Sequence, residues 1–499
     1  MTWFAFFLTF VVWFNLAPLA TAISAEFGLE PGQIRTLAIC NVALTVPARI
    51  IIGMLLDRYG PRLTYSLLLI YAAIACIAFA SSQSFGQLVA SRLALSIVGA
   101  GFVIGIRMVA EWFPPKEIGL AEGIYGGWGN FGSAFSAFTM VALAGAFSFM
   151  PGAFQVPDGP VLNWRTAIAF TGIVAAVYGV IYYLSVEDTP PGKPYQRPHS
   201  ARGLEVTSQR DFLFLMLMNI PLTGILMVLA WRLQKVGFLT GSAYPIVLVA
   251  LLGLYLYQAY NCWMVNKELL AGRKTYAPED RYPFSQVALL ELTYIVNFGS
   301  ELAVVSMLPA FFELTFGLGK QAAGMIAASY AFMNLASRPG GGLISDRLGS
   351  RKTTMAVLLM GMGIGYLMMS TVTSGWWLPL AVLLTMACSF FVQAAEGSTF
   401  AMVPLVKRRV TGQIAGNVGA YGNVGAVAYL TIYSLLPEGV VGDRIFFQVL
   451  GIAGVIVSFL CFFFMKEPKG SFAEFHEGEE AYMVTHPTAL PNEQSARIL

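Results

Sequence analysis

The sequence predicts an all-helical protein that crosses a membrane many times. Of its 499 residues, 57% are apolar or aromatic and only 11% are charged, whereas a soluble domain carries about 25% charged residues. The mean hydropathy is +0.67. Because so few charges cannot cover a water-soluble body of this length, lipid must surround most of the surface. The net charge of +3 gives no reason to expect a nucleic-acid partner.

Long apolar stretches follow one another along the whole chain. A helix needs about 20 mainly apolar residues to cross the hydrocarbon core. The first stretch could also be a signal peptide, because Ala20-Thr21-Ala22 resembles a cleavage site, but it has no basic start and we expect a retained helix. The fourteen predicted spans lie near residues 3–22, 36–56, 63–82, 87–112, 117–147, 164–186, 212–231, 237–265, 284–316, 321–344, 353–372, 376–403, 411–436 and 445–465.

The distribution of basic residues predicts the orientation. With the N-terminus placed inside, twenty Lys and Arg residues fall in the cytoplasmic loops and tail and six fall outside, as the positive-inside rule requires. Arg232 and Lys235, between two of the stretches, go against this rule. No Asn-x-Ser/Thr acceptor occurs in the chain, which fits a bacterial protein. We therefore expect a multi-pass protein of a bacterial inner membrane with both termini in the cytoplasm.

The chain contains an internal repeat, which is its most informative feature. At an offset of 293, residues 119–132 match residues 412–425, mainly at glycines and with Asn130 over Asn423. Such a repeat is typical of two parallel halves of six helices each. At an offset of 289, the same residues recur at five positions, first as Gly53, Asp57, Arg58, Gly60 and Arg62 and again as Gly342, Asp346, Arg347, Gly349 and Arg351.

The two halves leave a central segment between them. The segment contains two extra apolar stretches, 212–231 and 237–265, so the chain has fourteen spans, or twelve if this pair does not cross the membrane. The repeat thus predicts four parts, namely an N-terminal bundle at 1–190, a central linker at 191–283, a C-terminal bundle at 284–466 and a cytoplasmic tail at 467–499.

Each half carries one arginine deep in an apolar stretch. Arg49 lies eight residues before Asp57, and Arg338 lies eight residues before Asp346, so each is about 12 Å from its loop and close to the bilayer midplane. An arginine at this depth needs an anion, and a nearby carboxylate is the simpler partner for a single one. Two equivalent arginines favour a clamp for a small planar oxyanion, because a guanidinium can donate two parallel hydrogen bonds.

The repeated glycine runs expose the backbone of one helix face. For most of these glycines, close helix packing is the simpler explanation. Asn130 and Asn423 are different, because an amide within such a face can donate a hydrogen bond to an anion.

Two of these patterns resemble known families. The loop pattern at 53–62 and 342–351 resembles the motif that follows the second helix of each half in the major facilitator superfamily. Residues 126–132 and 419–425 resemble the paired nitrate signatures of the nitrate/nitrite porter family. The resemblance implies that two arginines hold nitrate or nitrite between aromatic rings, in a site made of Arg49, Arg338, Asn130, Asn423, Phe102, Tyr294, Phe298, Gly129 and Gly422.

Charged groups within the spans bear on coupling. The resemblance implies that pure nitrate/nitrite exchangers have a pocket without titratable groups, whereas this chain carries Glu301, Glu396, Arg107 and Glu122 within its spans. Nitrate is the anion of a strong acid, so a proton carried with it must sit on the protein, and a buried Glu could hold it. For Arg107, a structural pair with Glu111 is an equal alternative.

These observations together predict a secondary transporter that moves nitrate, and nitrite as well, inward with protons by alternating access. Nitrate/nitrite exchange is the main alternative, followed by a carrier of another small planar anion. The tail is too short for the signalling domain of a sensor, and no P-loop, metal cluster or nucleophile–base pair indicates an enzyme or an ATP-driven pump. We expect no cofactor and no metal, and a monomer is favoured although the oligomeric state is open.

Overall fold

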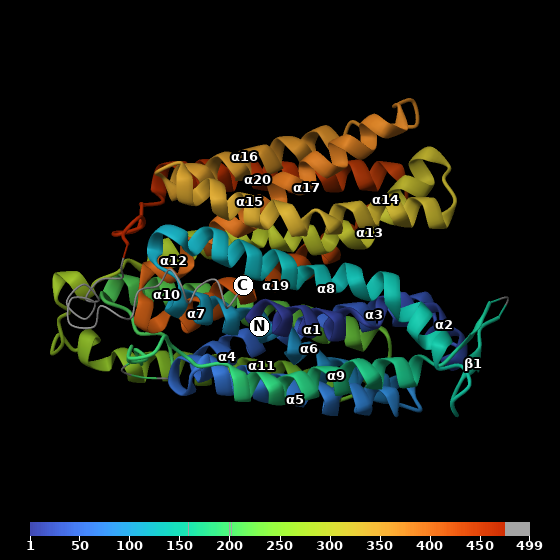
Figure 1. Cartoon of the computed structure of the whole chain (residues 1–499), viewed down its shortest axis with the longest axis horizontal. Coiled ribbons are helices and arrows are strands. Elements are labelled where there is room, and N and C mark those ends of the chain that lie inside the picture. The colour runs from blue at the N-terminus through green and yellow to red at the C-terminus, as the bar shows by residue number, and fades with distance from the viewer. Residues whose placement is uncertain (158, 199, 201, 475–499) are drawn as a thin grey trace.

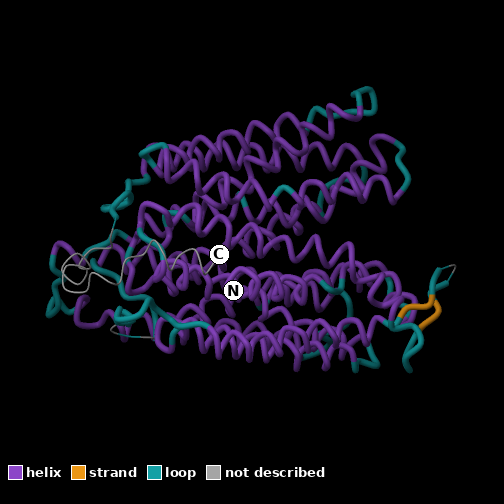
Figure 2. The backbone as a smooth tube through the Cα atoms, in the orientation of Figure 1, coloured by secondary structure: helices purple, strands orange, loops and turns teal. Residues whose placement is uncertain are grey.

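The computed structural model describes residues 1–157, 159–198, 200 and 202–474. These residues are almost entirely helical, with one pair of short strands (Figure 2). They contain eleven helices that are long and apolar enough to cross a membrane. Three further long helical segments, α8, α14–α15 and α19, are less apolar because glycines and polar residues interrupt them, and they complete the expected fourteen. The predicted all-helical membrane fold is therefore confirmed.

The first half of the chain supplies six helical rods. Short 3-10 turns join α1 to α2 and α6 to α7, and two strands, β1 (Phe154–Gln155) and β2 (Val161–Leu162), pair antiparallel before the last helix. Its helices are α1 (Thr2–Phe14), α2 (Ala20–Phe27), α3 (Pro31–Ala43), α4 (Thr45–Tyr59), α5 (Pro61–Ala80), α6 (Phe85–Ser96), α7 (Gly101–Trp112), α8 (Ile118–Ala146) and α9 (Trp164–Ser185).

The second half repeats this arrangement after a helical hairpin, α10 (Gln209–Lys235) and α11 (Ala243–Leu270). Most of the predicted tail, residues 475–499, lies outside the described residues. The helices of the second half are α12 (Phe284–Val296), α13 (Phe298–Phe316), α14 (Lys320–Phe332), α15 (Asn334–Arg347), α16 (Arg351–Met369), α17 (Leu378–Phe400), α18 (Val403–Val406), α19 (Thr411–Tyr433) and α20 (Val440–Phe464).

The two halves meet through equivalent pairs of helices. In Figure 1, α13–α17 and α20 form the upper body, and α1–α6 and α9 form the lower one. Across the interface, α4 packs against α19 and α8 packs against α15, and the internal repeat relates these two pairs to each other. The glycine-rich helices α8 and α19 therefore lie where the halves touch.

Several rods are interrupted near their middle, and the breaks position the central residues. Arg49 follows the break between α3 and α4, and Arg338 follows the break between α14 and α15. Phe298 directly follows the break at Asn297, whose side-chain oxygen accepts a 2.6 Å hydrogen bond from the Phe298 backbone N–H. These residues consequently lie at mid-depth, as the rise per residue predicts.

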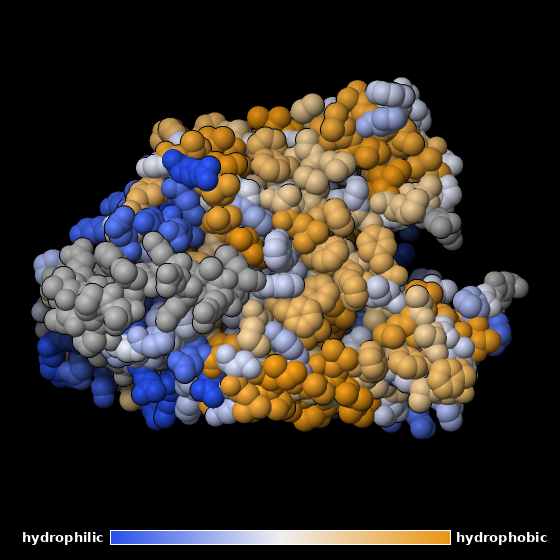
Figure 3. All heavy atoms as spheres, in the orientation of Figure 1, coloured by the Kyte–Doolittle hydropathy of each residue, from blue (hydrophilic) through white to orange (hydrophobic). Residues whose placement is uncertain are grey.

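The polarity of the surface changes along the length of the molecule. Figure 3 shows an apolar band around the middle, a hydrophilic end at the left and a hollow between the two bodies at the right. Large apolar side chains such as Leu67, Ile74 and Val177 are exposed on this band, as expected for a lipid-facing surface. We call the hydrophilic end, which carries Gly60 and Gly349 at its connections, the loop-motif end.

The central hairpin lies against both halves. Helix α10 packs against α3 of the first half and against α12 and α19 of the second, and α11 packs against α10. No residue in the most apolar window of α11 is buried. Both helices are long and apolar enough to cross a membrane, which favours fourteen spans over twelve.

Candidate functional site

The two intramembrane arginines meet at the centre of the molecule. Arg49 is fully buried and Arg338 nearly so. The guanidinium carbon of Arg49 lies 5.6 Å from the ring centre of Phe102 and 5.3 Å from that of Phe298. The corresponding distances for Arg338 are 6.0 and 5.8 Å. One arginine from each half thus lies against the same two rings.

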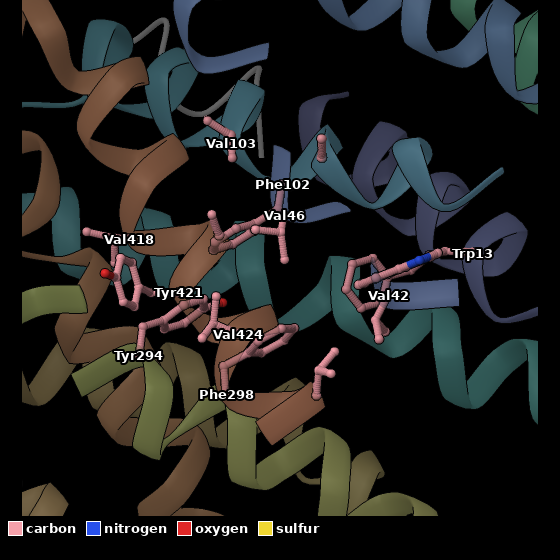
Figure 4. Packing of buried hydrophobic residues seen from close by; sticks show 14 of the residues in the cluster. Trp13, Val42, Val46, Phe102, Val103, Tyr294, Phe298, Val418, Tyr421 and Val424 are labelled. Carbon is pink, nitrogen blue, oxygen red and sulfur yellow. The ribbon is translucent and has the colours of Figure 1, made fainter. Parts of the chain in front are cut away.

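The three predicted aromatic side chains are nearly parallel. The rings of Tyr294 and Phe298 are 4.9 Å apart at an angle of 3°, and those of Phe102 and Tyr294 are 6.2 Å apart at 5°. Figure 4 shows Tyr294 and Phe298 packed in one cluster with Phe102 and Val46 of the first half. The structure thus brings the three predicted rings together.

The glycine runs bring each arginine against the opposite half. A methyl group on Gly419 would lie 3.1 Å from Cδ of Arg49, and one on Gly126 would lie 3.1 Å from Nη1 of Arg338. Arg49 Nη1 also donates a 2.5 Å hydrogen bond to the Gly419 carbonyl oxygen. These two glycines are related by the repeat, so each half provides a bare backbone surface for the arginine of the other.

The signature asparagines lie one turn beyond these glycines and are buried. Within the part of the chain that the structure describes, the Asn130 oxygen accepts no hydrogen bond and neither side-chain atom of Asn423 has a partner. Buried amides of this kind usually have partners, so both have capacity for a ligand. Gly129 packs against the Phe6 ring, and Gly422 packs against Tyr294 and Phe298, so these two glycines make room for rings.

The two arginines differ in their charged partners. Arg338 forms an ion pair with Glu396 and lies 3.5 Å from the Glu301 carboxylate. Arg49 has backbone partners, since its Nε and Nη2 donate 3.3 Å hydrogen bonds to the Gly99 carbonyl oxygen. Among the described residues, no carboxylate pairs with Arg49. The simpler interpretation, in which an arginine pairs with a carboxylate, therefore describes Arg338 in this conformation and does not describe Arg49.

Two amides complete the surroundings of Glu301. Its Oε1 accepts hydrogen bonds of 2.6 Å from Asn334 and 3.2 Å from Gln393. Sequence reasoning assigned no role to either amide. The signal was present, because Asn334 lies one turn before Arg338 and Gln393 lies one turn before Glu396.

Arg107 lies outside this central group. It pairs with Glu111 at 2.8 Å, lies 3.8 Å from Asp57 of the loop motif and donates to the Arg408 carbonyl oxygen. The structure thus contains the pair with Glu111, and a coupling role for Arg107 stays a prediction. Glu122 is buried, and neither of its oxygens accepts a hydrogen bond within the described residues.

The loop-motif aspartates join the halves at one end. Asp57 accepts hydrogen bonds of 3.0 and 2.9 Å from the backbone N–H groups of Gly412 and the residue after it, at the start of α19. Asp346 accepts bonds of 3.0 and 2.7 Å from Gly119 and its successor, at the start of α8. Carboxylates stabilise helix N-termini in this way. The contacts hold the loop-motif end closed.

The motif glycines allow either close helix packing or a sharp turn of the backbone. Gly53 and Gly342 pack directly on the backbone of Gly412 and Gly119. Two further glycines have positive φ angles, which disfavour other residues, at Gly60 (+91°) and Gly349 (+71°).

The motif arginines differ between the halves. Arg351 is buried and pairs with Asp346 at 2.7 Å. Arg62 donates a 2.7 Å hydrogen bond from Nε to the Tyr183 carbonyl oxygen. Arg58 and Arg347 are exposed, so the contacts between the halves do not depend on them.

Comparisons with known proteins agree with this geometry. The chain matches the model of the Major Facilitator Superfamily over residues 2–265 and 290–493. It is 69% identical to the nitrate/nitrite transporter NrtP of Picosynechococcus sp., over 98% of this chain and 96% of that one. It is 56% identical to the protein of the same name from Nostoc punctiforme, over 99% and 97%. The solved human organic anion transporter MFSD10 shares the fold, with a TM-score of 0.61 at 14% identity over 92% and 97% of the two chains.

Proposed function

Because the chain belongs to the major facilitator superfamily and, within it, to the nitrate/nitrite porter family, we propose that it carries nitrate and nitrite across a bacterial plasma membrane by alternating access. Relatives named as nitrate/nitrite transporters match it over nearly their full length. One structural observation carries the proposal for the binding site. A guanidinium from each half lies within 6.0 Å of the centres of the same two rings, Phe102 and Phe298.

The shape of this site fits a small planar anion. A guanidinium has five N–H donors, and the two backbone carbonyls that Arg49 contacts leave donors free for an anion. The parallel rings offer flat faces to a planar ion, whereas a tetrahedral phosphate or sulfate would collide with them. The unpartnered amide of Asn423 supplies a further donor.

The charges at the centre support coupling to protons. Two arginines and the carboxylates of Glu301 and Glu396 sum to zero when all four are ionised, so an added anion leaves an uncompensated negative charge in a buried site. Such a charge is costly, and a proton on one carboxylate removes it. The preferred mode is therefore inward symport of the anion with protons.

The conformation fits a transporter that is open on one side. The contacts of Asp57 and Asp346 close the loop-motif end, and Figure 3 shows the hollow at the opposite end. The positive-inside rule assigns the loop-motif end to the cytoplasm, with both termini on that side. In this proposal the bundles at 1–190 and 284–466 rock against each other, and anion binding between the arginines favours the occluded state.

Transport by the purified full-length protein in proteoliposomes tests the function. Isotopic nitrate uptake is measured with the proton gradient and the internal nitrite varied separately. We expect an inward proton gradient to drive accumulation, and collapse of the gradient to abolish it. Uptake that needs internal nitrite and ignores the gradient would instead assign exchange. Absence of nitrate uptake under every condition would contradict the function itself.

A further inference from the structure

Glu301 and Glu396 share Arg338 but differ in every other partner. Glu301 accepts hydrogen bonds from the amide nitrogens of Asn334 (2.6 Å) and Gln393 (3.2 Å). Glu396 is fully buried, and within the described ranges the only polar contact of its carboxylate is the one between Oε2 and Nη2 of Arg338. Its charge is therefore compensated by the ion pair with Arg338.

The two amides favour the ionised form of Glu301. An N–H donor stabilises a carboxylate and cannot accept a hydrogen bond from a protonated carboxyl group. Gln393 Nε2 is itself fixed, because it also donates a 2.9 Å hydrogen bond to the Tyr330 carbonyl oxygen. Protonation of Glu301 would therefore weaken two hydrogen bonds from amides, whereas protonation of Glu396 would weaken only its ion pair with Arg338.

We propose, on the basis of the proposed function, that Glu396 is the group that carries the proton. When an anion takes up the N–H donors of Arg338, Glu396 loses its charge partner in a buried site. A carboxylate left in this state is strongly disfavoured. A proton then adds to one of its oxygens, and no other bond forms or breaks. The anion and the carboxylate thus compete for Arg338, and the proton makes the exchange neutral.

The other titratable groups around α17 do not replace this role. The hydroxyls of Tyr330 and Tyr366 pair with each other at 2.8 Å. Glu122 on α8 accepts no hydrogen bond within the described residues, and the structure gives it no contact with Arg338. The titratable side chains described on the helices packed against α17 are Arg338, Asp346 and Arg347 on α15, Glu301 and Glu313 on α13, Glu291 and Tyr294 on α12, Tyr330 on α14, Arg351, Lys352 and Tyr366 on α16, and Glu122 and Tyr125 on α8.

Two transport measurements on the full-length protein separate the role of Glu396 from that of Glu301. Counterflow of isotopic nitrate against unlabelled nitrate needs no net proton movement, whereas gradient-driven accumulation does. We expect Glu396→Gln to retain counterflow that no longer depends on external pH, and to lose accumulation. Glu301→Gln should slow counterflow, and the activity that remains should keep the pH dependence of the wild type.

A matched control is a buried carboxylate outside the site. Asp443 accepts a 2.7 Å hydrogen bond from the Tyr433 hydroxyl at the start of α20, and Asp443→Asn should keep both counterflow and accumulation. If Glu396→Gln is not recovered as a folded protein, Glu396→Asp replaces it. This variant keeps a carboxyl group, so it should accumulate nitrate with an altered pH profile.

The results distinguish a failure of the assignment to Glu396 from a failure of the proposed symport. Accumulation by Glu396→Gln, or an unchanged pH profile in Glu396→Asp, would overturn the assignment of the proton to Glu396 while leaving symport in place. A wild-type protein that shows no gradient-driven accumulation would instead contradict the symport on which the inference rests.

Discussion

The two halves of the molecule present the same arginine in opposite electrostatic settings. Arg49 in the first half contacts backbone carbonyls, and among the described residues no carboxylate pairs with it. Arg338 in the second half pairs with Glu301 and Glu396. The repeat therefore explains the position of both side chains. In the proposed symport, the difference between the halves couples the clamp to protons, because Arg49 keeps its charge and the two carboxylates compensate the charge of Arg338 until an anion binds.

The largest expected effect concerns folding stability. Arg338→Gln leaves two buried carboxylates without a cation and should lower the free energy of unfolding by about 3–5 kcal/mol. Arg49→Gln leaves only carbonyl oxygens without a donor, at a cost of about 1–3 kcal/mol. Thermal unfolding in detergent measures both, and Arg338→Gln with Glu396→Gln should recover part of the loss. Equal losses in the two single variants would remove the proposed difference between the halves.

The next effect concerns anion binding, where the halves should behave alike. Arg49→Lys and Arg338→Lys keep the charge and lose the planar fork of donors. Each should weaken nitrate binding by about 2–3 kcal/mol, or roughly 30-fold to 150-fold. Equilibrium binding of isotopic nitrate to the purified variants is the measurement. Near-normal binding by either variant would mean that only one arginine holds the anion.

Substitution of the two glycines that face the arginines should lower nitrate affinity less, and by a similar amount in both halves. Gly126→Ala and Gly419→Ala each place a methyl group about 3 Å from the arginine of the other half, and overpacking of this kind costs about 1–3 kcal/mol. We expect the loss to appear in nitrate affinity. Gly324→Ala is the control, because no atom lies within 4 Å of the added methyl group. Unchanged affinity in both test variants would separate these glycines from the site.

The smallest expected effect concerns the opening of the loop-motif end. Asp57→Asn and Asp346→Asn weaken the helix caps on α19 and α8, and each should shift the equilibrium toward an open loop-motif end by about 1 kcal/mol. Alkylation of Ser345→Cys, which introduces a thiol at a buried position of this end, should become faster in both variants. The five native cysteines are buried and provide the background rate. Unchanged alkylation would show that the caps do not hold this end closed.

The sequence predicted the fold and most of the central site because a repeat and a short spacing define them. Arg49 and Arg338 follow from their distance to the loop aspartates, whereas Tyr294 and Phe298 follow only from the resemblance to the nitrate/nitrite porter family. The contact between Arg49 and Gly419 joins residues 370 positions apart. No local pattern encodes a contact at that separation.

The roles of Arg107 and of the two buried glutamates could not be predicted from the sequence, because they depend on neighbouring residues that only the fold brings together. Arg107 lies in an apolar stretch like the central arginines, but α7 carries it toward the loop-motif end, where Asp57 and Glu111 surround it. Glu301 and Glu396 look alike in sequence, and only the amides of Asn334 and Gln393 distinguish them. Sequence reasoning therefore grouped residues by chemical type, and the structure separated them by their partners.

An experimental structure with bound nitrate tests the central claim most directly. We predict density for one planar anion between the rings of Phe102 and Phe298, with oxygens about 3 Å from the nitrogens of both Arg49 and Arg338. Glu396 should then have moved away from Arg338. An anion held by one arginine alone, or bound elsewhere while Arg338 keeps both carboxylates, would contradict the account.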